Sequence, residues 1–456
     1  MNDNLLCLTK LEMSNFRCFR KMDKPMEFDP NLTVIVAKNG CGKTAVLDAI
    51  RISLGTFTKG TNLRSQAGIS KFDASLSPLR ISQGRGAFYP VAIRVDGFVD
   101  SKAEVWRRVR ESAEGRTTTK EAQPIANFGT RLRAAVSAEG DALPELPILA
   151  FYGTGRLWNA DTDGVKEQML QKGLAFESRF SGYEDALTTN SIYAQVKQWM
   201  GDAWLCRANP VEQETAVGKQ TSRQYSAVEQ ATNEILKGTG YRSPHFNTYF
   251  KEVALLNDRS GNDEAIAVPI SWTSDGIKAA FSLVADIAYR CARLNPAFGE
   301  DACRKTQGVV MIDEVDLFLH PAWQQRILPD LRRIFPKIQF VVTTHSPQVV
   351  SSIPPECIRI IAEDGQIEGV PTWTEGVESS RILDDVFGTK PYPVENEWRR
   401  KLDQYIKDVY AGKWNDPAVR HLGDELSAKF AGMDADFDTA RLHVENEEWE
   451  RDHASN

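Results

Sequence analysis

The chain has 456 residues, of which 42% are hydrophobic, 26% charged and 9% aromatic, which is the composition of an ordinary globular protein. Its 55 Lys and Arg against 62 Asp and Glu give a net charge of −7, which excludes a uniformly basic nucleic-acid binder but allows a local basic groove. The seven scattered cysteines include no Cys-x-x-Cys pair and favour a reducing compartment over a disulfide framework or structural zinc. Without a signal-peptide pattern or a run of roughly 20 apolar residues, we expect a soluble cytoplasmic protein with no membrane partner.

The first half of the chain predicts strands interrupted by one helix and one long loop. Residues 5–16 and 32–37 predict strands, and the second is a nearly continuous apolar run, typical of a buried sheet. Helical spacing follows over 44–55. The next segments predict two strands joined by a polar turn over 87–110, a polar loop over 111–143 and a third strand over 146–156.

The second half predicts a return to alternating helices and strands. Between 157 and 266 the pattern is mainly helical, at 183–204 and 225–236. From 267 onward we expect helices over 277–291 and 321–334 and buried strands over 307–314 and 338–345. After 390 the spacing predicts two amphipathic helices, and the acidic residues 433–456 predict a frayed or exposed end. These changes predict four parts: 1–156, 157–266, 267–390 and 391–456.

A phosphate-binding loop is predicted directly after the strand at 32–37. Residues 37–44 match the pattern Gly-x-x-x-x-Gly-Lys-Ser/Thr except at the first position, where Ala37 replaces glycine. The loop residues after Ala37 are Lys38, Asn39, Gly40, Cys41, Gly42, Lys43 and Thr44. Closely spaced glycines let backbone N–H groups converge on a phosphate, lysine neutralises its oxygens, and the threonine hydroxyl can bind magnesium. A chance match is the alternative, but the position between a buried strand and a helix argues against it.

Three further segments carry candidate site residues, each with a plainer alternative. Asp313 and Glu314 end a buried strand, where the first can hold magnesium and the second can activate water, or the strand can simply end in a polar turn. His345 ends the next strand and can contact a γ-phosphate, or be an ordinary histidine at a strand end. Ser274 and Gly276 begin the 277–291 helix, as an anion site or an ordinary helix cap.

The order of these motifs resembles that of the ABC-type ATPases of the RecF, SMC and OLD group. The resemblance implies an α/β fold: an ABC-type P-loop NTPase with a mixed sheet, an antiparallel β excursion, a helical insertion and C-terminal helices. It also implies ATP and Mg²⁺ as cofactors and a head-to-tail homodimer or higher oligomer, in which Ser274 and Gly276 contact the nucleotide of the other protomer. The opening segment 11–20 resembles the group's first strand, and Arg17 is its candidate nucleotide contact.

Segments 148–158, 176–187 and 274–290 are similar to the PtuA ATPases of Septu-type antiphage systems, which also accompany some retrons. This similarity implies an ATPase subunit that senses or gates nucleic acid, DNA above all, for an HNH nuclease partner of the PtuB kind. The main alternative is a RecF-like DNA-repair clamp. A transporter subunit and a scaffold that rarely hydrolyses ATP are further alternatives. The arginines of 106–110 can meet a phosphate backbone, or form a solvated face of a hairpin.

Overall fold

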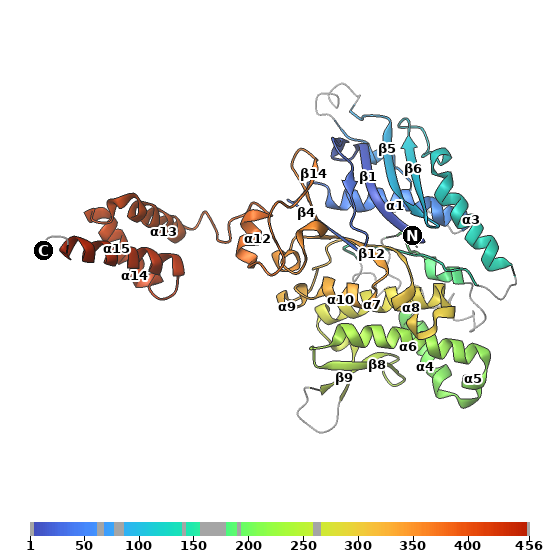
Figure 1. Ribbon diagram of the computed structural model, residues 1–456. Coiled ribbons are helices and arrows are strands. Elements are labelled where there is room, and N and C mark those ends of the chain that lie inside the picture. Colours follow the sequence, from blue (N-terminus) through green and yellow to red (C-terminus); the bar gives the residue numbers. More distant parts are fainter. Residues whose placement is uncertain are drawn as a thin grey trace. The chain divides into compact units, whose positions relative to one another are not determined.

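The computed structural model divides the chain into two compact units, Met1–Ile382 and Leu383–Asn456 (Figure 1). It describes residues 4–61, 68–76, 86–138, 143–155, 179–188, 193–258 and 266–453. The first part of the predicted helical insertion, 157–178, therefore lies outside the described residues. The four-part division stays a prediction, and the two units are described separately below.

A six-stranded sheet forms the centre of the first unit, in the order β14-β13-β4-β12-β11-β7. Five strands are parallel, and β14 pairs antiparallel at one edge. Every side chain of β4, β7, β11 and β12 is buried, as expected for a parallel sheet covered on both faces. The strands are β4 Leu32–Ala37, β7 Ile148–Tyr152, β11 Gly308–Ile312, β12 Ile338–Thr344, β13 Ile358–Ile361 and β14 Ile367–Gly369. The buried strands predicted from the apolar runs are confirmed.

A second, antiparallel sheet has the order β2-β1-β5-β6, and β3 also pairs with β1. Its strands are β1 Leu6–Phe16, β2 Phe19–Lys21, β3 Met26–Glu27, β5 Val91–Val99 and β6 Lys102–Arg110. The predicted pair of strands at 87–110 is confirmed as β5 and β6. Asp100 and Ser101 make the turn between them with positive φ angles of 54° and 61°.

Helix α1, Lys43–Gly60, contacts strands of both sheets and packs along α3, Gln123–Ser137. A Cβ on Gly60 would lie 2.2 Å from the carbonyl oxygen of Ala126, so the two helices approach too closely there for a larger residue. The loop predicted over 111–143 is therefore wrong at α3, which buries Ile125 and Phe128 on one face.

Helix α7, Asp275–Leu294, corresponds to the helix predicted over 277–291 and packs against α4 Tyr193–Ala208, α6 Ala216–Leu236 and α8 Ala302–Lys305. Further helices of the first unit are α5 Pro210–Glu214, α9 Pro321–Gln324, α10 Ile327–Ile334 and α11 Pro347–Val350, and α12 Ser379–Asp385 spans the unit boundary. The helix predicted over 321–334 is in fact two, α9 and α10. Strands β8 Tyr241–Asn247, β9 Glu252–Asn257 and β10 Ile266–Pro269 form a small antiparallel sheet within the predicted insertion and just beyond it.

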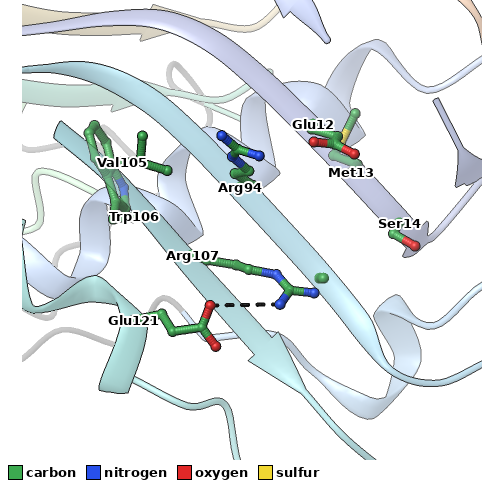
Figure 2. A pocket seen from close by; sticks show the side chains of 9 residues that line it. Glu12, Met13, Ser14, Arg94, Val105, Trp106, Arg107 and Glu121 are labelled. Carbon is green, nitrogen blue, oxygen red and sulfur yellow. Dashed lines mark ion pairs between the residues drawn. The ribbon is translucent and has the colours of Figure 1, made fainter. Parts of the chain in front are cut away.

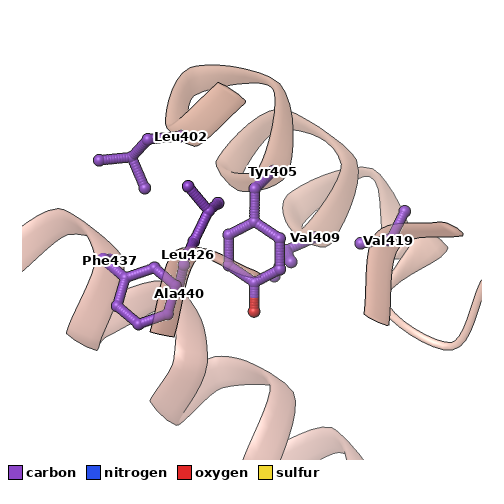
Figure 3. Close-up of a cluster of buried hydrophobic side chains, with 7 residues drawn as sticks. All are labelled: Leu402, Tyr405, Val409, Val419, Leu426, Phe437 and Ala440. Carbon is purple, nitrogen blue, oxygen red and sulfur yellow. The ribbon is translucent and has the colours of Figure 1, made fainter. Parts of the chain in front are cut away.

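The described part of the second unit contains the α-helices α13 Glu397–Asp408, α14 Pro417–Phe430 and α15 Ala435–His453, and a short π-helix, Val409–Lys413, follows α13. Figure 3 shows their shared core of Leu402, Tyr405, Val409, Val419, Leu426, Phe437 and Ala440. Of the frayed or exposed acidic end predicted over 433–456, fraying is wrong where α15 forms, because Phe437 is only 1% exposed, whereas most other side chains of this helix are exposed as expected. Within the described ranges, no helix of either unit has the length and apolar character required to span a bilayer.

Candidate active site

The loop between β4 and α1 depends on two glycines with left-handed backbone angles. Gly40 has a φ of 81° and Gly42 a φ of 103°, backbone angles that residues with a Cβ rarely adopt. A Cβ on Gly42 would also lie 2.4 Å from the sulfur of Cys18, whereas a Cβ on Gly40 would meet no atom within 4 Å. Cys18 thus packs against the loop beside Gly42, a contact that the sequence pattern did not reveal.

Lys43 is a buried lysine at the start of α1, with its Nζ donating to the carbonyl oxygen of Ala37 at 3.1 Å. Burial lowers its pKa, while the nearby charges of Glu314 and Asp313 act in the opposite direction. The ammonium group therefore lies close to both predicted carboxylates. An anion placed in the loop would supply the compensation that a buried cation requires.

Asp313 receives a hydroxyl hydrogen bond on each carboxylate oxygen. Thr44 Oγ1 donates to Oδ2 at 2.9 Å, and Thr343 Oγ1 donates to Oδ1 at 2.5 Å. The second contact follows from the sheet, because Ile312 and Val342 are paired in register and the next residues of β11 and β12 then lie side by side. The structure therefore joins the P-loop to Asp313, and it adds Thr343, to which the sequence argument gave no role.

Glu314 follows Asp313 with a positive φ of 49°, an uncommon angle for a residue other than glycine. Its backbone N–H donates to Thr343 Oγ1 at 2.7 Å, and the N–H of Val315 donates to the Thr343 carbonyl at 3.0 Å. One threonine therefore holds both Asp313 and the backbone of Glu314. Such strain and fixation at a candidate catalytic residue are typical of pre-organised sites.

His345 lies directly beyond β12, among the same charged groups. Burial lowers its pKa and the positive charge of Lys43 lowers it further, against the effect of Glu314, Asp316 and Asp313. Thr344 beside it donates to Asp316 at 2.5 Å. The P-loop therefore forms one cluster with three residues from other strand ends, Asp313, Glu314 and His345.

Arg17 and Lys38 are both paired with carboxylates. Arg17 is half-buried and bonds Asp48 at 2.7 Å and Asp73 at 2.9 Å. Asp48 belongs to α1, so this pair fastens the end of β1 to the P-loop helix. Lys38 pairs with Glu363 at 2.8 Å on the surface. Nucleotide contact by Arg17 stays a prediction.

Ser274 and Gly276 lie at the N-terminus of α7. Ser274 is exposed in the N-cap position, but its side chain makes no capping hydrogen bond, so the ordinary-cap alternative does not account for its hydroxyl. A Cβ on Gly276 would lie 2.9 Å from the carbonyl oxygen of Phe318. The loop after Glu314 therefore packs against this helix start, which requires glycine there.

The arginines of β6 have different roles. Arg108 is 5% exposed and donates to Thr56 and to the carbonyl of Ile52, and burial lowers its pKa to about 10. It is therefore a structural residue, and both the phosphate contact and the solvated face expected for 106–110 are wrong at this position. Arg107 instead lines a surface cleft with Arg94, where it pairs with Glu121 at 3.7 Å (Figure 2).

The donor groups of the cluster fit a nucleotide with magnesium. A threonine hydroxyl and a carboxylate only 2.9 Å apart are hard oxygen ligands of the kind magnesium prefers. The space beside the Cα of Gly40 is open, and Lys43 supplies a positive charge. The arrangement suits phosphoryl transfer, in which positioning and charge stabilisation do most of the catalytic work.

Comparisons with known proteins support the same chemistry. A family model described as an AAA domain matches residues 10–237, half of the chain, and a second AAA domain model matches 149–351. The retron Ec83 probable ATPase of Escherichia coli is 26% identical, over 98% of this chain and 88% of its own length. The Septu protein PtuA of Bacillus thuringiensis is 33% identical, over 29% of this chain and 37% of its own.

Among solved structures, an SMC head bound to the C-terminal winged-helix domain of ScpA aligns with a TM-score of 0.47 and 16% identity. It covers 81% of this chain and 98% of that chain. The chain belongs to the AAA domain family and is a P-loop ATPase, with sequence similarity to a retron ATPase and to PtuA.

Proposed function

We propose that this chain is the ATPase subunit of an antiphage defence system, and that ATP controls a partner HNH nuclease through it. Two findings support the proposal. The bond between Thr44 and Asp313 assembles a site suited to ATP and magnesium, and the similarity to a retron ATPase extends along 98% of the chain. The first supports the chemistry, and the second supports the biological setting.

We assign the roles within the site as follows. Lys43 and the amides of the loop from Lys38 to Gly42 hold the triphosphate, and Thr44 with Asp313 holds magnesium, which neutralises phosphate charge when it is bound. Glu314 accepts a proton from the attacking water, and His345 contacts the γ-phosphate.

The site is completed by a second copy of the chain in this proposal. Ser274 and Gly276 at the start of α7 contact the nucleotide held by the other protomer, so hydrolysis requires a head-to-tail dimer. The exposed hydroxyl of Ser274, which caps nothing in its own helix, is the feature that supports this role. The assembled dimer then governs access of the nuclease to DNA or another nucleic acid.

The test combines an ATPase assay with a phage assay. Glu314→Gln should still bind ATP but lose about 10²-fold or more in turnover, the usual worth of a positioned base. Glu368→Gln, an exposed change on β14, is the matched control and should keep full activity. Full turnover by Glu314→Gln would remove the catalytic assignment.

In cells carrying this gene and its neighbour, Lys43→Ala should restore phage plating to the level without the genes. Protection that survives Lys43→Ala would separate defence from nucleotide binding. ATP-dependent DNA binding by the chain alone, with no nuclease encoded beside it, would favour the RecF-like clamp instead.

A further inference from the structure

The net charge of the protein resides in its second unit. Residues 383–456 contain 10 Lys and Arg and 17 Asp and Glu, so residues 1–382 keep 45 of the 55 basic and 45 of the 62 acidic side chains. The first unit is therefore neutral overall, and the second carries the whole charge of −7. This uneven distribution of charge bears on binding partners, because a charged region attracts partner surfaces of the opposite sign and repels those of the same sign.

The outward side of α15 presents two large apolar side chains to solvent. Trp449 is 62% exposed and Leu442 is 54% exposed. They are seven residues apart and so share one side of the helix. Phe437 and Ala440, in contrast, point into the three-helix core (Figure 3). Neither Leu442 nor Trp449 belongs to this core or packs against it.

The indole of Trp449 is ordered by a neighbour on its own helix. It stacks on His453, with ring centroids 4.3 Å apart and an angle of 24° between the rings. By helical spacing, Asp438, Glu445 and Glu450 border the same side of α15, and Glu445 pairs with Arg441 at 3.5 Å. Leu442 and Trp449, bordered by these carboxylates, are called the α15 outer face below.

We propose that the α15 outer face is the docking surface for a protein partner with an apolar pocket surrounded by Lys and Arg. The inference rests on the proposed function, because a nuclease that binds the phosphates of nucleic acid must carry a basic surface, which would complement the acidic second unit. A pre-ordered tryptophan within a charged rim is the pattern of an interface hot spot. Nucleic acid is disfavoured as the occupant because its phosphates would face carboxylates.

The experiment measures the affinity of the full chain for the nuclease encoded beside it, by calorimetry at two salt concentrations. Trp449→Ala should weaken binding at least about tenfold, as expected for a central aromatic anchor. Trp373→Ala is the matched control, since Trp373 is 63% exposed but lies in the first unit; it should leave the affinity unchanged. ATPase activity should be the same in both variants.

Charge is tested separately. Glu445→Lys with Glu450→Lys should weaken binding and flatten its salt dependence, while Glu111→Lys with Glu114→Lys, two exposed changes in the first unit, should do neither. Equal affinity of the Trp449→Ala and Trp373→Ala chains would overturn the docking surface and leave the proposed function intact.

Two other results would overturn the inference in different ways. If the wild-type chain forms no complex with the nuclease, the partner assigned in the proposed function fails as well. If Trp449→Ala instead changes the mass of the chain alone in light scattering, or its affinity for a DNA duplex, then the occupant is a second copy or nucleic acid.

Discussion

Thr343→Val provides the sharpest test of the site geometry. Valine has nearly the same shape as threonine but lacks the hydroxyl, which here donates to Asp313 at 2.5 Å and accepts from the N–H of Glu314 at 2.7 Å. The first is a charge-assisted bond worth about 1.5–3 kcal/mol and the second is worth about 0.5–1.5 kcal/mol. The variant should therefore lose about 2–4 kcal/mol of stability in the first unit. Its turnover should fall because Asp313 and Glu314 lose their common anchor.

Thr33→Val is the matched control, because Thr33 is equally buried in the neighbouring strand β4 but accepts only one hydrogen bond, from the N–H of Asp29 at 3.0 Å. It should cost about 1 kcal/mol and leave turnover unchanged. Scanning calorimetry can measure the stability of the two units, and a steady-state ATPase assay gives kcat. If both valine variants have the same turnover, the argument that Thr343 positions the two acidic residues is refuted.

Three further outcomes are expected. Gly42→Ala should reduce ATP affinity more than Gly40→Ala in a nucleotide titration, because only the first adds a contact, at 2.4 Å with Cys18, to the backbone strain; equal losses would contradict the packing described. Ser274→Ala should slow hydrolysis without weakening ATP binding to the chain's own loop, whereas unchanged turnover would argue against a site shared between protomers. Because the pKa of His345 is lowered, its imidazole stays neutral below pH 6.5. Any fall of kcat/KM on acidification that is caused by protonation of His345 should therefore occur below pH 6.5, and it should be absent in His345→Gln. A limb above pH 6.5 that vanishes in this variant would contradict the burial argument.

The elements around the site could be predicted because their signals are local. The runs at 32–37 and 308–312 are apolar on both faces, the glycines of the phosphate-binding loop follow the first run and a pair of acidic residues follows the second, so strand and loop are indicated by adjacent residues. Helix α3 carried an equally local signal, with Ile125, Phe128 and Leu132 at helical spacing, but the many polar residues around it favoured a loop. Helix α15 was missed for the same reason, since Phe437 and Ala440 alone mark its buried face.

The contacts that organise the site could not be predicted, because they depend on register and on distant segments. Thr343 meets Asp313 only once β11 and β12 are aligned at Ile312 and Val342. Arg17 finds Asp48 and Asp73 from two other segments. No pattern within a single stretch contains these pairings, so the roles of Asp313 and Glu314 were predictable while the residue that holds them was not.

The placement of charge has one more consequence, for the behaviour of the protein in concentrated solution. A unit with 45 basic and 45 acidic side chains has no net charge to keep its copies apart, and neutral proteins tend to associate and precipitate. The three-helix unit supplies all of the mutual repulsion. Removing residues 383–456 should therefore lower the solubility of the ATPase unit near neutral pH, even if its fold is unchanged.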